Sequence, residues 1–425
     1  MWILIELQQQ LQQQLASLEP SSKHAIIALQ AESDTSDWQP LSWLKAQGSF
    51  PHFFWQSRDE ALSIATLGAI RQFDNLESAE AFSLQHGVPV VGGLTFEGQC
   101  QFILPRLSLA KQGDKLTACL YLDLADIENE KAESERLLQQ LAIFLPHQAI
   151  TQRIISCQSA KDFNAWQTLI AQALNAIEHA NFRKVVLANA TTFGLDQAIN
   201  PYDLLYASQQ KNRGCYHFLW CENGSATFLG SSPERLYQRT GKQLKTEALA
   251  GTVAVSPDPN ETERNALWLL SDEKNVYENQ LVVDDIYQHL HDCSEQIQVS
   301  QAEIKRLPNV QHLRRAIQAT LKTGVQDSDC LARIQPTAAV AGLPRHNALP
   351  FIAEHEGFER GWYAGTLGYM QPEQAEFCVT LRSAKLCADQ LTLYAGAGIV
   401  AGSTPESEWQ EIERKRMAIG GLLAR

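Results

Sequence analysis

Two carboxylates and an ammonium near the carboxyl end of the chain have the spacing of one helical face. Glu408, Glu411 and Lys415 stand at positions i, i+3 and i+7, after the segment Ser403-Thr-Pro-Glu406, which is suited to cap a helix. Such a group could hold a hard cation together with an anionic ligand. The spacing alone favours a plainer interpretation, because Glu411 and Lys415 also have the spacing of an ordinary solvated i,i+4 pair.

Three glycines stand just before this segment, at Gly396, Gly398 and Gly402. They predict a strand that ends near Tyr394, then a glycine turn, then the helix. Glycine permits close backbone approach to a ligand, as it does in a dinucleotide-binding turn. A dinucleotide site is not expected, because the third glycine does not fall in the GxGxxG position and the helix begins only after Gly402.

Lys184 lies in a predicted strand over residues 182–190. With a period of two, its side chain shares a face with Val186, Ala188 and Ala190. Desolvation on such a face disfavours the ammonium and lowers the pKa of a lysine, which is how a lysine becomes a base near neutral pH. A lysine that reaches solvent at the end of the strand fits the pattern equally well.

Two further carboxylates stand where burial could change their chemistry. Glu234 follows a strand that runs into a turn, and it could act as a general acid if burial raises its pKa. Spacing alone favours an exposed pair with Arg235 instead. Glu278 lies on a predicted helix near the apolar Leu281, so its carboxylate needs a partner. A Mg²⁺ ion shared with Glu411 would supply one, since Mg²⁺ commonly takes one or two protein carboxylates.

Groups that could bind an anion occur in two other segments. Gly251 and Thr252 follow a predicted strand and could offer a backbone N–H and a hydroxyl to a carboxylate. Arg382 stands alone among apolar residues in a predicted strand over residues 380–384, and a forked guanidinium suits a substrate carboxylate. A simple turn in the first case and an internal salt bridge in the second are the alternatives.

Composition excludes several classes of partner. The 425 residues are 44% apolar and 20% charged, with a net charge of −13. This charge argues against a surface that binds nucleic acid or anionic membranes, although a bound cation or a local basic group could still attract an anionic small molecule. Nine scattered cysteines without a CxxC pair indicate reduced thiols. No signal peptide or membrane span is evident, so a cytoplasmic protein is expected.

The chain divides by pattern into two regions without a flexible linker. Residues 1–150 are predicted to be a scaffold of short strands and turns, in which no chemistry is expected, and residues 151–425 hold every candidate above. We interpret the regions as layers of one intertwined α+β unit, because short turns indicate antiparallel strands that helices then cover. The helices predicted in the second region span residues 160–180, 202–210, 260–293, 310–322 and 404–424.

Together these segments resemble the chorismate-utilising enzymes, and within them the isochorismate synthases. The resemblance is strong over residues 155–425 and rests on eight motifs in order. These are Lys-Val-Val-Leu-Ala (184–188), Ser-Pro-Glu-Arg-Leu (232–236), Thr-Glu-Ala-Leu-Ala-Gly-Thr (246–252), Glu278-Asn with Val-Val-Asp-Asp-Ile (282–286), Gln-Pro-Thr-Ala-Ala-Val-Ala-Gly-Leu-Pro (335–344), Gly-Trp-Tyr-Ala-Gly (361–365), Thr-Leu-Arg-Ser-Ala (380–384), and Ala-Gly-Ala-Gly-Ile-Val (395–400) with Glu411 and Lys415.

The resemblance implies two large stacked antiparallel β-sheets with helices packed outside, and a Mg²⁺-dependent conversion of chorismate to isochorismate. In that reaction Lys184 would activate water for attack at C2, and Glu234 would protonate the hydroxyl that departs from C4. Glu278 and Glu411 would hold Mg²⁺, with Glu408 nearby. The implied substrate-binding residues are Ala250, Gly251, Thr252, Tyr363, Arg382, Gly396 and Lys415.

Two positions separate the activities found among such enzymes. Related anthranilate synthases carry glutamine where Lys184 stands and use ammonia, and aminodeoxychorismate synthases place a covalent lysine at the position of Ala250. No glutamine amidotransferase partner is expected, because Gly214-Cys215-Tyr216 does not continue into the G-x-C-x-G pattern of such nucleophiles.

The pathway is less sharply indicated. Gln335 stands where many relatives have histidine, which argues against the ammonia users. The segment from Gln335 to Arg345 and the Gln/Leu-rich start favour the menaquinone branch. There are three alternatives. Two are enzymes: an isochorismate synthase of a siderophore pathway, and a salicylate synthase, which also uses water and then eliminates pyruvate. The third is a non-catalytic binding protein.

Overall fold

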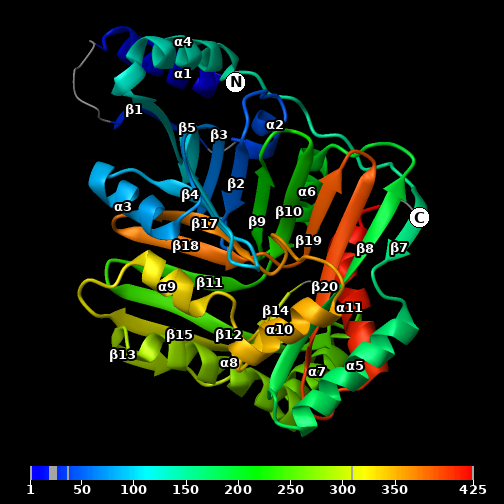
Figure 1. Ribbon diagram of the computed structural model, residues 1–425. Coiled ribbons are helices and arrows are strands. Elements are labelled where there is room, and N and C mark those ends of the chain that lie inside the picture. Colours follow the sequence, from blue (N-terminus) through cyan, green and yellow to red (C-terminus); the bar gives the residue numbers. More distant parts are fainter. Residues whose placement is uncertain (1, 19–25, 36–37, 308–309, 424–425) are drawn as a thin grey trace.

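Antiparallel strand pairing organises the chain. In the computed structural model, which describes residues 2–18, 26–35, 38–307 and 310–423, twenty strands join by hydrogen bonds into one continuous sheet (Figure 1). Strand β5 (Cys100–Gln112) joins two halves of this sheet. Its carboxyl-terminal part pairs with β6 (Lys115–Asp123) and its amino-terminal part pairs with β4 (Val90–Leu94).

The two halves mix strands from the start and the end of the chain. The first half runs β1 (Ile26–Asp34), β6, β5, β3 (Leu62–Phe73), β2 (His52–Gln56), β9 (Tyr216–Cys221), β10 (Ala226–Ser232), β19 (Ser383–Cys387), β20 (Gln390–Ile399), β8 (Lys184–Leu195) and β7 (Ile154–Ser159), with β16 (Gly342–Leu343) also on β8. The second half runs from β5 through β4, β17 (Thr366–Gln371), β18 (Gln374–Val379), β11 (Arg235–Thr240), β12 (Gln243–Ala254) and β15 (Val310–Leu321), which also pairs with β13 (Ser294–Val299) and β14 (Glu303–Arg306).

The inner faces of the two halves pack against each other in one hydrophobic core. Trp55 of β2 and Tyr369 of β17 meet edge to face, with ring centroids 5.6 Å apart. Phe218 of β9 and Phe377 of β18 are completely buried in the same core. The predicted α+β fold with stacked antiparallel layers is therefore confirmed. The two layers are continuous because β5 is long enough to pair in both.

In each half of the sheet, strands from the two regions of the sequence pair directly with each other. Strand β2 lies between β3 and β9, and β4 lies between β5 and β17. The division near residue 150 stays a prediction.

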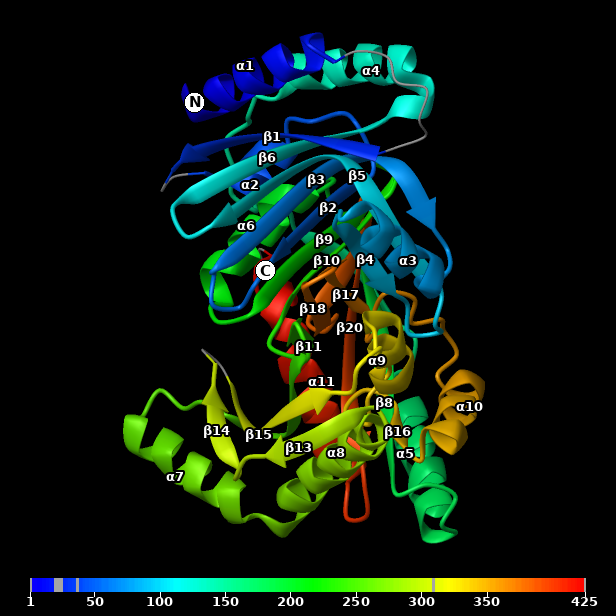
Figure 2. The ribbon, with the colours of Figure 1, turned by 90° about the vertical axis from the view of Figure 1, so that its left-hand side faces the viewer.

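Helices cover the outer faces (Figure 2). A second hydrophobic core lies between the first half of the sheet and α1 (Trp2–Ala16), α2 (Pro40–Leu44), α4 (Ile127–Gln140), α6 (Pro201–Lys211) and α11 (Pro405–Gly420). The other helical elements are α3 (Leu76–His86), α5 (Phe163–Glu178), α7 (Pro259–Ser271), α8 (Glu273–His291), α9 (Asp327–Ile334), α10 (Arg345–His355) and a 3₁₀ turn (Leu124–Asp126). Among the helices in the described ranges, none is long and apolar enough to cross a membrane.

The predicted helix over residues 310–322 is wrong. Residues 310–321 form β15, which pairs with β12, β13 and β14. Its leucine, alanine, arginine and glutamine residues favour a helix in isolation, but pairing with three strands and packing against α8 outweigh that weak preference. The predicted helix over 260–293 is divided at Asp272, whose carboxylate accepts a hydrogen bond from the Asn275 amide at 3.0 Å and so caps α8.

The glycine turn predicted after Tyr394 is also wrong. Strand β20 continues through Gly396 and Gly398 and pairs with β8 along this length. The strand predicted over residues 380–384 is interrupted, because Arg382 lies between β18 and β19 in the left-handed region with a φ of 47°. A non-glycine residue in this region is strained and is held there by its surroundings.

A buried ion pair holds β8 against the segment before α10. Glu356 accepts hydrogen bonds from the Ala188 amide at 2.7 Å and from Arg360 Nε at 2.8 Å. Arg360 also donates to the carbonyl oxygens of Val186 and Val340, at 2.8 Å each. Both charged side chains are 1% exposed. The pair therefore fixes the strand that begins with the predicted base.

Glu356→Ala should destabilise the protein by roughly 3–5 kcal/mol, because the Arg360 guanidinium stays buried without its counter-charge. Urea unfolding followed by tryptophan fluorescence measures the loss. The matched control, Glu263→Ala, breaks an ion pair with Arg306 between side chains that are 55% and 56% exposed. This control should cost less than about 1 kcal/mol. Equal losses in the two variants would contradict the role given to the buried pair.

Candidate active site

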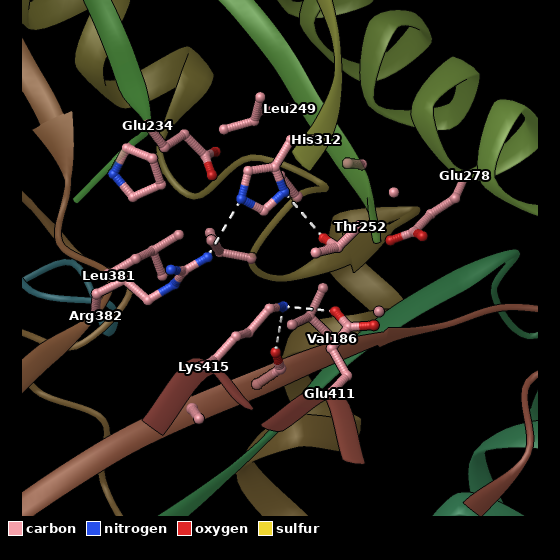
Figure 3. Close-up of a pocket in the computed structure, with 18 of the residues that line it drawn as sticks. Val186, Glu234, Leu249, Thr252, Glu278, His312, Leu381, Arg382, Glu411 and Lys415 are labelled. Atoms are coloured by element: carbon pink, nitrogen blue, oxygen red, sulfur yellow. Dashed lines mark hydrogen bonds and ion pairs between the residues drawn. The ribbon is translucent and has the colours of Figure 1, made fainter. Parts of the chain in front are cut away.

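A cavity that opens to solvent lies between the two halves of the sheet (Figure 3). Strands β8 and β20 and helix α11 form one side, and the β10–β11 turn, β12, β15 and α8 form the other. Most of the site residues predicted from the sequence line it. They are Glu234, Ala250, Gly251, Thr252, Glu278, Tyr363, Arg382, Gly396, Glu411 and Lys415.

Glu234 presents a carboxyl group that can donate a proton. It stands in the turn between β10 and β11 and is 5% exposed. Burial, and then the charge of Glu247, raise the pKa of Glu234 to about 8. A carboxyl group with this pKa holds its proton at neutral pH, as a general acid must. The exposed pair with Arg235 does not form, because Arg235 pairs with Glu376 at 3.2 Å.

Lys184 is completely buried, and its ion-pair partner Glu278 lines the cavity. The Nζ atom of Lys184 lies 3.0 Å from Glu278 Oε1, in an ion pair. Lys184 does not itself line the cavity. In the part of the chain that the structure describes, its ammonium makes no well-directed hydrogen bond. The alternative that Lys184 reaches solvent at the end of its strand is therefore not observed. An acceptor such as water could take a hydrogen bond from its Nζ atom.

Glycines on β20 allow the closest contacts of the site. A Cβ atom at position 398 would lie 2.3 Å from Glu278 Oε1 and 3.0 Å from Lys184 Cε. A Cβ atom at position 396 would lie 2.8 Å from the Tyr363 hydroxyl. Gly396 and Gly398 are thus needed for close approach within a strand, and not for a turn.

The carboxylates of α11 are each paired with a lysine. Glu411 Oε1 lies 2.7 Å from Lys415 Nζ, which also donates to the Gly396 carbonyl oxygen at 2.8 Å. Glu408 does not line the cavity, and its Oε1 lies 2.8 Å from Lys274 Nζ. Against the opposing effect of burial, Lys415 lowers the pKa of Glu411. Burial, and then the charge of Glu411, raise the pKa of Glu408.

Glu278 and Glu411 present oxygen donors that suit Mg²⁺. The two carboxylates line the same cavity and point toward one another from α8 and α11 (Figure 3). Across the described residues, no group of three or more Asp, Glu, His or Cys side chains could hold a metal ion by itself. Mg²⁺ commonly completes its shell with water and substrate oxygens, so two carboxylates at a cavity fit this ion.

A polar chain of three side chains forms another wall. Arg382 Nη2 lies 3.3 Å from His312 Nε2, and His312 Nδ1 lies 3.0 Å from Thr252 Oγ1. Burial, and then the charge of Arg382, hold the pKa of His312 well below its ordinary value. The imidazole is therefore neutral and accepts the hydrogen bond from the arginine. No internal salt bridge to Arg382 is present among the described residues, so its charge can serve an anion.

Among the polar side chains that line the cavity, His312 and Tyr394 were missed in the sequence. His312 was missed because residues 310–322 were expected to be helical. Its register would have identified it, because His312 stands opposite Thr252 in the β12–β15 pair. Tyr394, whose ring stacks on that of Tyr363 with centroids 5.2 Å apart, was interpreted only as the end of an apolar strand.

Asn279, the neighbour of Glu278, holds α8 against this wall. Its completely buried Nδ2 group lies within hydrogen-bond distance of the carbonyl oxygens of Ala248, Ala250 and Leu313, at 3.2, 3.3 and 3.1 Å. Ala248 and Ala250 are on β12 next to an irregularity in its pairing with β15. One amide side chain thus fixes Glu278 relative to both strands.

Comparisons with known proteins identify the family. The chorismate binding enzyme family matches residues 95–424. The isochorismate synthase MenF of Haemophilus influenzae is 43% identical over 418 residues, which cover 98% of this chain and 96% of that protein. The isochorismate synthase MenF of Escherichia coli is 42% identical over 389 residues, which cover 90% of each chain.

Solved structures agree with this match. MenF, the menaquinone-specific isochorismate synthase from Escherichia coli, has a TM-score of 0.94 and 40% identity, covering 99% of this chain and 100% of that one. Anthranilate synthase component I from Streptococcus pneumoniae has a TM-score of 0.70 at 19% identity, covering 95% and 93%, and so shares the fold. With a family match over residues 95–424 and relatives this similar over nearly its whole length, the chain belongs to the chorismate binding enzymes.

Proposed function

We propose that this protein is an isochorismate synthase that interconverts chorismate and isochorismate for menaquinone biosynthesis. The observation that carries the proposal is 42–43% identity, over 90–98% of the chain, to isochorismate synthases of two bacteria. The geometry supports it, since the residues that the reaction requires lie in or beside one cavity.

The reaction moves a hydroxyl group around a ring without a net change in atoms. Water adds at C2, the C4 hydroxyl departs as water, and the ring double bonds shift between these carbons. The incoming water must lose a proton and the departing hydroxyl must gain one, so the site needs a base and an acid at different places. We assign the base to Lys184 and the acid to Glu234.

The environments of these two groups support their roles. Glu234 has a pKa of about 8, so its proton is present at neutral pH. Lys184 lies on β8, away from the turn that carries Glu234, and no well-directed hydrogen bond occupies its Nζ among the described residues. Lysine at position 184 and alanine at position 250 also suit water as the nucleophile, because the ammonia-using and lysine-linked relatives differ at these two positions.

Anion binding is assigned to the basic and polar wall. Arg382, Lys415 and the segment Gly251-Thr252 line the cavity and would bind the substrate's carboxylates. Glu278 and Glu411 would hold Mg²⁺, which when bound would offset the charge of the ring carboxylate. A local positive field is needed, since the protein as a whole carries a net charge of −13.

Incubation of the purified protein with chorismate and Mg²⁺ should yield isochorismate, and isochorismate in its place should yield chorismate. Chromatography identifies the products. EDTA should abolish both conversions and excess Mg²⁺ should restore them. If salicylate and pyruvate are the main products, the protein is a salicylate synthase and the proposal is wrong. Unchanged chorismate would favour a non-catalytic binding protein.

Lys184→Ala should lower turnover by about 10²–10⁴-fold, because the attacking water loses its base. Equilibrium dialysis should find chorismate affinity within a few-fold of the wild type. Lys385→Ala, which removes an exposed lysine from the neighbouring part of the sheet, is the matched control and should leave turnover unchanged. Near-normal turnover in the Lys184 variant would refute the assignment of the base.

The forward rate should fall as the pH rises through about 8, because Glu234 then loses the proton that it must donate. The direction follows from the raised pKa, since a carboxyl group is protonated below its pKa and ionised above it. Glu234→Gln cannot release a proton and should be inactive across the range. A turnover number that stays level from pH 7 to about pH 10 would exclude Glu234 as the acid.

A further inference from the structure

The turn that carries Glu234 is held at both ends by groups that meet at one buried carboxylate, Glu247. Glu247 lies on β12 and is 2% exposed. On one side of Glu234, the Arg235 amide donates to Glu247 Oε1 at 3.3 Å. On the other side, the Pro233 carbonyl oxygen accepts hydrogen bonds from two cationic side chains that also contact Glu247. The residues on both sides of Glu234 are therefore connected by hydrogen bonds to the same carboxylate, one directly and the other through Arg58 and Lys305.

Three cations surround Glu247. Arg58 donates to both carboxylate oxygens of Glu247, with Nη2 3.0 Å from Oε2, and to the Pro233 carbonyl oxygen at 3.2 Å. Lys305 Nζ donates to the same carbonyl oxygen and lies 3.5 Å from Glu247 Oε1. Arg314 Nε donates to Glu247 Oε2 at 2.6 Å. Despite its burial, Glu247 stays ionised, because these partners hold its pKa well below the ordinary value.

These charges face Glu234 as well. After burial, the charge of Glu247 is the main influence that keeps the proton on Glu234, and nearby lysines act in the opposite direction. The titratable or charged groups that face Glu234 from the surrounding elements are Glu247, Lys184, Lys305, Lys415, Tyr363 and Arg382. Without the Glu247 carboxylate, Glu234 would face a cationic surrounding that favours its ionised form.

We propose that Glu247 is a positioning residue for Glu234: it fixes both ends of the acid's turn, and its charge offsets the cations that would draw the proton away. The proposal rests on the general-acid role proposed for Glu234. It also gives the first 150 residues a part in the chemistry, because Arg58 lies in the turn between β2 and β3.

Two substitutions should move the protonation of Glu234 in opposite directions. Glu247→Gln removes the negative charge and should lower the pH at which Glu234 ionises by at least about one unit. Lys305→Met removes a positive charge and should raise that pH. The matched control is Glu303→Gln, which removes a carboxylate that also pairs with Arg314 but is 56% exposed, and it should shift nothing.

Infrared difference spectroscopy on the full-length protein follows the proton directly. The carbonyl band of a protonated carboxyl group that is lost in Glu234→Gln belongs to Glu234, and its disappearance with pH gives the midpoint without any need for turnover. In the wild type this midpoint should lie near 8. The alkaline limb of the turnover profile should move with it in each variant.

The outcomes separate this proposal from the proposed function. Opposite shifts of the infrared midpoint support the role of Glu247 even if the wild type forms no isochorismate, a result that would overturn only the activity. An unchanged midpoint in Glu247→Gln, shifts of both variants in one direction, or no band from Glu234 would overturn the role of Glu247. If Glu247→Gln does not fold, Lys305→Met decides: a rise supports the proposal and an unmoved midpoint refutes it.

Discussion

The site depends on one constraint: charged side chains are buried between the two layers of the sheet, away from water. Burying a carboxylate or an ammonium costs on the order of several kcal/mol unless a partner of opposite charge compensates it. Here the compensation is pairwise, with Lys184 against Glu278 at 3.0 Å and Lys415 against Glu411 at 2.7 Å. Each carboxylate assigned to Mg²⁺ therefore has a cation beside it already. This balance lets an acidic protein keep ionised groups around a cavity that is to receive an anion.

Two carboxyl groups close in sequence and space show how strongly this balance controls chemistry. Glu247 is surrounded by arginines and a lysine and remains ionised, whereas burial and the charge of Glu247 raise the pKa of Glu234 to about 8. The same side chain thus carries a fixed charge at one position and is the proposed proton donor at the other. Environments that push two pKa values apart are the usual way to divide such roles.

Local patterns sufficed for the elements whose faces are set by their own sequence. The apolar seam beside Glu278, the strand that begins at Lys184 and the turn at Glu234 follow from periods of 3.6 and 2 and from strand ends. Interactions between distant segments decided the rest. Residues 310–321 form a strand because β12, β13 and β14 pair with it, and a sequence rich in helix formers gives no sign of those partners.

The glycines of β20 were likewise misinterpreted because their reason lies elsewhere in the chain. Position 398 requires glycine because a side chain there would collide with Glu278, which lies 120 positions earlier in the chain and pairs with Lys184. Family resemblance pointed to residues that the fold brings to one cavity, because the positions of motifs reflect such long-range constraints. It could not supply the register or the pairing of each charge.

Closure of the two layers is what completes the site. Arg58 is contributed by the turn between β2 and β3, while Glu247 and Arg314 come from β12 and β15 in the other half of the sheet. The Pro233 carbonyl and the Glu247 carboxylate are fully satisfied only when these halves are packed together. A first region that served only as hydrophobic cover would need no arginine at this point. The network therefore favours one cooperative unit, in which burial of the core also assembles the surroundings of the proposed proton donor.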